Sequence, residues 1–275
     1  MKIEFLKLDK KQNKLSFILR NANPAFANAI RRNAIEEVPV MAIEDVEFRN
    51  NSSVIYDEIV AHRLGLIPLT TDLKSYNLPD KCKCDGKGCA QCQLKLILKV
   101  LGQGVVYSSD IKSTDPKVKP AYQKIPIVKL LKGQKLEFEA TATLGKGKDH
   151  TKWSPGLVYY KDMPIININK QCKNPEVVIE QCPQNVFEVK NNNLVLNKDN
   201  LLNCHLCNAC VDICEPKGAI TLDKNDKDFI FYVESWGQLE PKEIINEALK
   251  IIKNTSDEFI KEIKKTPVKE KVSKK

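Results

Sequence analysis

The chain has 275 residues, 42% of them hydrophobic, and this length allows one large domain or two to three small domains with packed cores. Its formal net charge is +9, but residues 264–275 hold six Lys and one Glu, so +5 lies in this tail and +4 on the body. A body so weakly basic argues against a dedicated DNA-binding face. No apolar run approaches the length of a membrane span, so we expect a cytoplasmic protein without membrane contact and with a disordered basic tail.

The first predicted elements are a hairpin and a helix. Residues 3–19 alternate between apolar and polar around a polar turn at 9–13, which is typical of two paired strands. Asn23 and Pro24 form a helix start, because an Asn side chain caps the first turn and proline loses no hydrogen bond there. The helix ends before Pro39, and a strand follows. Their apolar residues are Phe26, Ala27, Ile30, Ala34 and Ile35 in the helix, and Met41, Ile43, Val46 and Phe48 in the strand.

Two segments of different composition follow. Residues 50–163 contain alternating strands, such as 94–100, separated by turns rich in Gly, Pro and Ser, which predicts a β-rich domain. Residues 164–224 are rich in Cys, Asn and Pro. The chain then returns to a strand at 229–233 and a long amphipathic helix after Pro241, which either covers its own sheet or binds a partner. The apolar stripe of this helix consists of Ile245, Ala248, Leu249, Ile252, Phe259 and Ile263.

The first cysteine cluster predicts a zinc site. Ten cysteines in a cytoplasmic chain indicate metal or cluster ligation, because the cytosol keeps thiols reduced. Cys82, Cys84, Cys89 and Cys92 stand as CxCxxxxCxxC on a loop that contains glycine, and four thiolates can close a tetrahedron around Zn²⁺. We expect a structural site without an open position. An iron–sulfur cluster is disfavoured by the cramped CxC spacing, and four free surface thiols would be prone to oxidation.

The second cluster has the spacing of an iron–sulfur protein. Cys204, Cys207, Cys210 and Cys214 stand as CxxCxxCxxxC, the run of bacterial-type ferredoxins, in which the fourth cysteine binds the other cluster. His205 lies inside this run and is expected to be an exposed loop residue. The alternative to an iron–sulfur cluster is zinc or no metal.

An internal repeat assigns the ligands. Adding 32 to Cys172 gives Cys204, and adding 32 to Cys182 gives Cys214, so the region consists of two related halves. The first half has Pro175 and Val178 where the second has Cys207 and Cys210. We therefore expect one cluster held by Cys204, Cys207, Cys210 and Cys182, and a vacant second site. With all four ligands the cluster would be 4Fe-4S, and if Cys182 is displaced the other three would hold a 3Fe-4S cluster. There Cys172 and Cys214 would face each other as free thiols or as a disulfide.

Several stretches together resemble one protein family. Residues 27–48 read ANAIRRNAIEEVPVMAIEDVEF, and residues 57–69 read DEIVAHRLGLIPL. Lys152-Trp153-Ser154-Pro155 and the pattern from 229–233 through Gly237 to Pro241-Lys242-Glu243 follow in the same order. Across almost its whole length the chain resembles the D subunit of archaeal DNA-directed RNA polymerase, a relative of the third subunit of eukaryotic polymerase II and of the bacterial polymerase α subunit.

The resemblance implies an α+β chain in which a split dimerisation domain carries two inserts. The expected parts are 1–49 and 225–263 (the two halves of the dimerisation domain), 50–163 (β-rich insert domain with zinc loop 82–92), 164–224 (ferredoxin-like iron–sulfur insert) and 264–275 (basic tail). In the family the dimerisation domain pairs with a smaller homologue, subunit L. The residues expected at this partner interface are Phe26, Ile30, Arg31, Arg32, Ile245, Leu249 and Ile252.

By resemblance we expect a non-catalytic assembly subunit of DNA-directed RNA polymerase. With subunit L it would form a platform for the two large catalytic subunits and small assembly subunits, and it would meet DNA only through the complex. Arg31, Arg32 and Arg63 are expected to pair with carboxylates. The chain has no Walker motif, nucleophile elbow or Mg²⁺-binding Asp triplet. A ferredoxin-type electron carrier would not need the remaining residues, and the weakly basic body disfavours a zinc-containing nucleic-acid-binding module.

Overall fold

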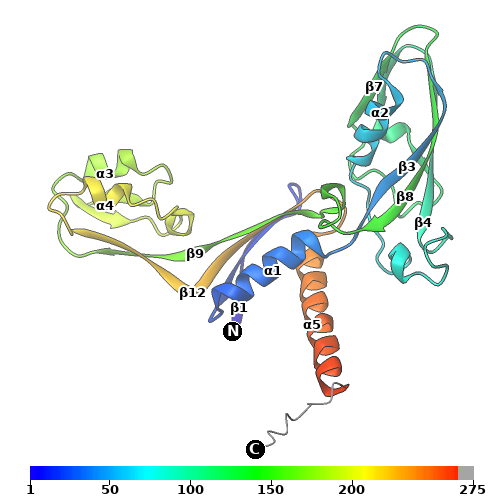
Figure 1. Cartoon of the computed structure of the whole chain (residues 1–275). Coiled ribbons are helices and arrows are strands. Elements are labelled where there is room, and N and C mark those ends of the chain that lie inside the picture. Colours follow the sequence, from blue (N-terminus) through cyan, green and yellow to red (C-terminus); the bar gives the residue numbers. More distant parts are fainter. Residues whose placement is uncertain (266–275) are drawn as a thin grey trace, which may run out of the picture. The chain divides into compact units, whose positions relative to one another are not determined.

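The computed structural model describes residues 1–265 (Figure 1). Contacts divide them into two compact units, each made of separate segments. The first comprises Met1–Lys7, Ser16–Asn28 and Tyr159–Tyr232, and the second comprises Leu8–Leu15, Ala29–Val158 and the chain from Val233 onwards. The helices are α1 (Pro24–Glu36), α2 (Asp57–Gly65), α3 (Pro175–Gln181), α4 (Ala209–Ile213) and α5 (Pro241–Lys265). The strands are β1 (Lys2–Asp9), β2 (Lys14–Arg20), β3 (Val40–Asn51), β4 (Gln93–Leu101), β5 (Gly104–Tyr107), β6 (Lys112–Ser113), β7 (Pro126–Leu130), β8 (Lys135–Gly145), β9 (Gly156–Ile168), β10 (Phe187–Lys190), β11 (Asn193–Leu196) and β12 (Ile220–Ser235).

The predicted hairpin and helix start are both confirmed. β1 and β2 are neighbours in a four-stranded sheet of order β1-β2-β12-β9. In the turn between them, the Asp9 carboxylate accepts hydrogen bonds from the backbone N–H groups of Lys11 and Gln12. At the start of α1, Asn23 Oδ1 accepts a hydrogen bond from the Phe26 N–H at 2.7 Å. The local side chains therefore fix both the turn and the helix start.

Strand β12 is much longer than the predicted strand at 229–233. It spans Ile220–Ser235, and its first half is charged and mostly exposed, whereas residues 229–231 are fully buried. Because β12 lies between β2 and β9 in the sheet, backbone pairing holds the charged half extended without an apolar pattern. The hydrophobic pattern predicted only the part of the strand that enters a core.

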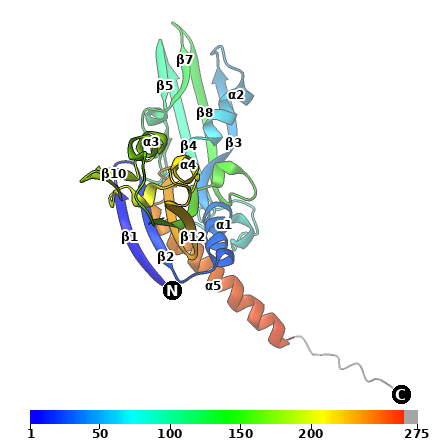
Figure 2. The same cartoon turned by 90° about the vertical axis from the view of Figure 1, so that its left-hand side faces the viewer.

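The β-rich segment forms an antiparallel sheet of order β3-β8-β4-β6. β8 is central and pairs with β3 from Val40 opposite Gly145 onwards, and with β4 on its other side (Figure 2). Phe138, Leu96 and Leu98 are fully buried in its core. β3 crosses the predicted boundary at residue 50, as β9 crosses that at 163 and β12 that at 224. The domain boundaries stay predictions.

The cysteine-rich segment has a small core of its own in the first unit. α3, α4 and the β10–β11 hairpin surround buried Val178, Phe187 and Ile220 together with several cysteines. Cys182 immediately follows α3, and Cys214 immediately follows α4. This matching placement supports the two-fold repeat that the cysteine spacing predicted.

Helix α5 is buried near its start and exposed at its end. Ile244, Ile245 and Ala248 are buried, whereas every described residue from 253 onwards is exposed. The helix includes Lys264 and Lys265, which were predicted to begin the tail. Their positive charges in the last turn interact favourably with the helix dipole and so stabilise this end of the helix. The remaining tail, 266–275, lies outside the described residues. No helix within 1–265 has the length and apolar character needed to cross a bilayer.

The cap at Asn23 gives a stability test. Replacing Asn23 by Ala leaves an N–H of the first turn of α1 without its acceptor, so we expect a loss of about 1 kcal/mol in the free energy of unfolding, measured by thermal or urea denaturation. Asn254→Ala, in the exposed middle of α5, is the matched control and is expected to be neutral or slightly stabilising. Equal losses in both variants would contradict the cap.

Candidate metal centres

The loop at 82–92 turns sharply between its cysteines. Backbone hydrogen bonds run from the N–H of Asp85 to Cys82 O at 3.0 Å, and from the N–H of Cys92 to Cys89 O at 3.0 Å. Asp85, Gly86 and Gly88 have positive φ angles, which allow the chain to reverse within a few residues. The loop therefore directs cysteines that are close in sequence towards one point.

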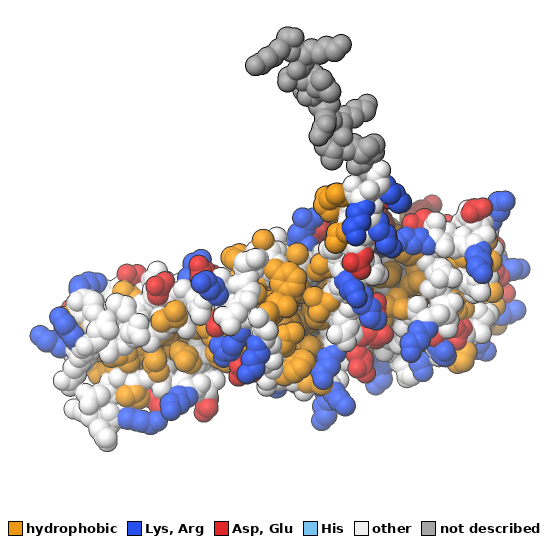
Figure 3. All heavy atoms as spheres, turned by 90° about the horizontal axis from the view of Figure 1, so that it is seen from below, with side chains coloured by type: hydrophobic (Ala, Val, Ile, Leu, Met, Phe, Trp, Pro, Cys, Tyr) orange, Lys and Arg blue, Asp and Glu red, His pale blue; other side chains and the backbone are white. Residues whose placement is uncertain are grey.

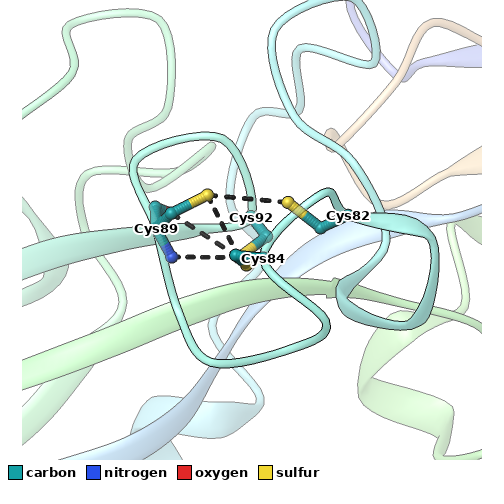
Figure 4. A group of neighbouring side chains, drawn as sticks. All are labelled: Cys82, Cys84, Cys89 and Cys92. Carbon is teal, nitrogen blue, oxygen red and sulfur yellow. Dashed lines mark hydrogen bonds between the residues drawn. The ribbon is translucent and has the colours of Figure 1, made fainter.

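The four sulfur atoms of this loop form a compact group (Figure 4). Cys82 Sγ lies 3.5 Å from Cys89 Sγ, Cys84 Sγ lies 3.5 Å from Cys92 Sγ, and Cys89 and Cys92 sulfurs lie 3.9 Å apart. Four sulfurs at ~2.3 Å from one tetrahedral ion would be ~3.8 Å apart. The observed spacing fits a single metal ion held by four thiolates.

Protonation in the metal-free loop is uneven. A hydrogen bond from the Cys92 thiol lowers the pKa of Cys84 to about 6, while burial raises the pKa of Cys92 to about 12. Without a metal, the loop favours the thiolate at Cys84 and the protonated thiol at Cys92. A bound cation would stabilise the thiolate form of all four cysteines. The lysines at 81, 83 and 87 are exposed, whereas the cysteines are buried or half-buried.

The second predicted ligand set lies around a pocket in the first unit. Cys182, Cys204, Cys207 and Cys210 line this pocket together with apolar residues that include Phe187. Cys204 and Cys210 are buried, Cys182 is half-buried and Cys207 is exposed. The structure therefore brings together all four predicted ligands, although Cys182 comes from a different half of the repeat.

The spacing of these sulfurs differs from that in the 82–92 loop. Among the described residues they do not form a group within 4.8 Å, whereas the sulfurs of 82–92 do. Thiolates that bind separate irons of a cluster must stand farther apart than thiolates that share one ion. Two sulfurs accept backbone hydrogen bonds, Cys204 from the Leu206 N–H at 3.4 Å and Cys182 from the Val186 N–H at 3.5 Å. The donor set thus fits an iron–sulfur cluster better than a single ion.

The two remaining cysteines of this segment, Cys172 and Cys214, lie together in the other half of the repeat. Cys172 and Cys214 face each other as free thiols, with sulfur atoms 2.7 Å apart and both residues buried. The Asn174 amide accepts from the Cys172 thiol and the Glu215 N–H, and donates to Ile213 O. Val178, which replaces a ligand, is fully buried. An apolar side chain thus lies in the core at the position where the other half of the repeat has Cys210.

Comparison with known proteins places this architecture in a family. The model of the RNA polymerase Rpb3/RpoA insert domain matches residues 46–158. Proteins named DNA-directed RNA polymerase subunit Rpo3 are similar over most of the chain. That of Archaeoglobus fulgidus is 42% identical, covering 92% of this chain and 95% of its own, and that of Thermococcus kodakarensis is 40% identical, covering 96% and 98%. That of Methanosarcina acetivorans is 38% identical, covering 94% and 97%.

The chain belongs to the Rpo3 family of DNA-directed RNA polymerase subunits. Rpo3 and the D subunit of the predicted family are two labels for the same polymerase component. The alternative of a ferredoxin-type electron carrier is not supported, because Rpo3 proteins match over nearly the whole length and not only over the cysteine-rich segment.

The predicted interface residues are distributed unevenly in this Rpo3-family chain. Ile30 and Ile245 are buried, and Phe26, Arg31, Leu249 and Ile252 are half-buried. Arg32 is exposed and pairs with Glu36 of its own helix at 3.0 Å, and Arg63 donates to Pro126 O at 2.8 Å. The most exposed apolar residues of α5, Phe259 and Ile263, were in the predicted stripe but not among the predicted interface residues.

The different pKa values of the cysteines in the 82–92 loop predict different reactivities of their thiols. After metal removal, Cys84 should be alkylated by iodoacetamide at pH 7 much faster than Cys92, because only the thiolate reacts. The rate at Cys84 should fall as the pH drops through about 6, where this thiolate becomes protonated. Peptide mass spectrometry measures both rates. Equal rates at the two residues would contradict the described loop geometry, and bound metal should protect all four cysteines.

Proposed function

We propose that this chain is the non-catalytic assembly subunit of its DNA-directed RNA polymerase and that it pairs with a small partner subunit, subunit L. The pair would form a platform for the two large catalytic subunits and small assembly subunits. The relatives that match nearly the whole chain carry the name of a polymerase subunit, and this supports the role. Nucleotide transfer would then be catalysed by the polymerase complex in the cytoplasm, and this chain would contact DNA only indirectly, through that complex.

The single observation that carries the pairing is the exposed end of α5. Phe259 is 67% exposed, Ile260 48% and Ile263 58%. Figure 3 shows hydrophobic side chains among lysines on the described end of this helix. Large apolar side chains gathered on one exposed element mark a surface that another protein covers.

The spacing of the apolar residues indicates a helix as the partner. Ile245, Leu249, Ile252, Phe259 and Ile263 follow one another at intervals of four, three, seven and four residues, which fits the pattern of a helix–helix seam with one position missing. Ser256 occupies the position missing from this series and donates its hydroxyl to Ile252 O at 2.8 Å within the helix. A smaller homologue with an equivalent helix, as in the family that the sequence resembles, would supply the complementary stripe.

We further propose that Zn²⁺ is the ion of the 82–92 loop and that Cys182, Cys204, Cys207 and Cys210 hold one 4Fe-4S cluster. If Cys182 is displaced, the other three cysteines would hold a 3Fe-4S cluster instead. Four thiolates at tetrahedral spacing support the first assignment, and ferredoxin spacing with separated sulfurs supports the second. Both centres would act structurally, because each stabilises a polar segment that buries little apolar area.

Metal analysis tests the two centres. The purified chain should contain about one zinc, which is lost on Cys92→Ser. It should also be coloured and contain about three or four irons, and Cys182→Ala should lower the iron content. Cys172→Ala is the matched control, since Cys172 faces Cys214 instead of the pocket, and it should leave iron unchanged. A colourless chain with zinc at both places would contradict the cluster assignment.

Negative charges introduced by substitution into the apolar stripe of α5 test the pairing with the small subunit. The double variant Phe259→Asp, Ile263→Asp should lose the small subunit, and with it the large subunits, when tagged full-length chain is purified from its native cells. The control variant Asn254→Asp, Lys261→Gln changes the net charge by the same amount on the opposite face of the helix and should retain them.

Mass spectrometry of the purified complexes identifies the partner. Recovery of a second copy of this chain in place of a small subunit would show that the chain forms a homodimer, and it would contradict the proposed heterodimer. Recovery of the full set of subunits with the Asp variant would show that the exposed end of α5 is not the pairing surface.

A further inference from the structure

We propose that Lys161 is the counter-charge of the iron–sulfur cluster and raises its reduction potential. Lys161 would place a positive charge beside the cluster and would not bind an iron. The inference deepens the cluster assignment made above and rests on it. It assigns a role to a side chain on β9 that no cysteine pattern singles out.

Lys161 reaches the cluster loop from outside the cysteine-rich sequence. Its ammonium donates a hydrogen bond to the backbone carbonyl of Cys204 at 3.0 Å, and Cys204 is one of the four proposed ligands. The same ammonium lies 5.7 Å from the centre of the Tyr232 ring, on whose face a cation is favoured. These contacts hold the charge against the loop that carries the thiolates.

The environment of Lys161 separates it from the other lysines nearby. Lys161 is half-buried, and within residues 1–265 no carboxylate forms an ion pair with it, whereas Lys224 pairs with Asp162 at 3.2 Å and is mostly exposed. Burial lowers the pKa of Lys161, and the Cys204 thiolate opposes this change. A partly desolvated cation is costly to keep unless a negative charge lies close to it. The proposed cluster, with four thiolates, supplies that charge.

The sign of the effect follows from electrostatics. Reduction adds an electron to a centre that four thiolates already make negative, so a nearby positive charge stabilises the reduced state more than the oxidised state. Removing the charge should therefore lower the midpoint potential. Because Lys161 is partly buried, water and salt screen this interaction less than they would at an exposed lysine.

The test is a redox titration of the full-length chain, followed by visible absorption and electron paramagnetic resonance. Lys161→Met removes the charge and keeps the length, and should lower the reduced-to-oxidised ratio at a fixed potential by about tenfold, which corresponds to about 59 mV for one electron. Lys161→Arg keeps the charge and should stay close to the wild type. Lys224→Met removes an exposed, ion-paired charge and should leave the midpoint unchanged.

The outcomes separate this inference from the cluster assignment. Wild-type chain without iron would overturn both. A normal wild-type cluster with the same midpoint in Lys161→Met would overturn the role of Lys161 alone, as would an equal shift in Lys224→Met. Loss of the cluster in Lys161→Met with retention in Lys161→Arg would support the need for positive charge. Loss of the cluster in both variants would overturn the proposed role of the Lys161 charge, because the cluster would then depend on the shape of the side chain and not on its charge.

Discussion

The pairing of β2 with β12 is the interaction on which the other parts of this chain depend. It joins a strand near the start of the sequence to one near its end, in the sheet β1-β2-β12-β9. The rings of Phe17 and Phe231 stack across this pair with centroids 5.0 Å apart, and Arg20 pairs with Asp228 at 3.1 Å. Because the two strands close the sheet from opposite ends of the sequence, the residues between them are insertions that must stabilise themselves.

The two insertions achieve this in different ways. The β-rich segment buries large side chains such as Phe138, Leu96 and Leu98 on a central strand that is paired on both sides. The cysteine-rich segment has two short helices and a two-stranded hairpin, and cysteines make up a large share of its buried residues. So small a core gives little hydrophobic stabilisation, and the cluster proposed around Cys204 would supply part of what is missing. The ion proposed at 82–92 would do the same for a polar loop of the β-rich segment. Within the described residues, the end of α5 from 253 to 265 is exposed and not covered by a core, and a partner protein would complete it.

Local signals predicted much of this structure, and long-range contacts account for the rest. The cap at Asn23, the turn after Asp9 and the meeting of Cys182 with Cys204 followed from residue types and spacing, because neighbouring atoms or a repeat fix them. The charged half of β12 was missed because strand pairing, which has no local signature, extends it. Burial of Ile30 and Ile245 could not be separated from partner binding, since both uses need the same apolar stripe. Lys161 was missed because its contact with Cys204 joins residues that are distant in sequence.

The apolar surface along α5 is the part of the chain that a second, smaller polymerase subunit is proposed to complete. Hydrogen–deuterium exchange of the full-length chain, measured alone and after addition of that subunit, tests this proposal most directly. We expect the amides at 253–265, in the part of α5 whose residues are exposed in the isolated chain, to exchange faster than those at its buried start and to become strongly protected on addition, while the buried start changes little. Equal exchange at 253–265 in both samples would contradict the account.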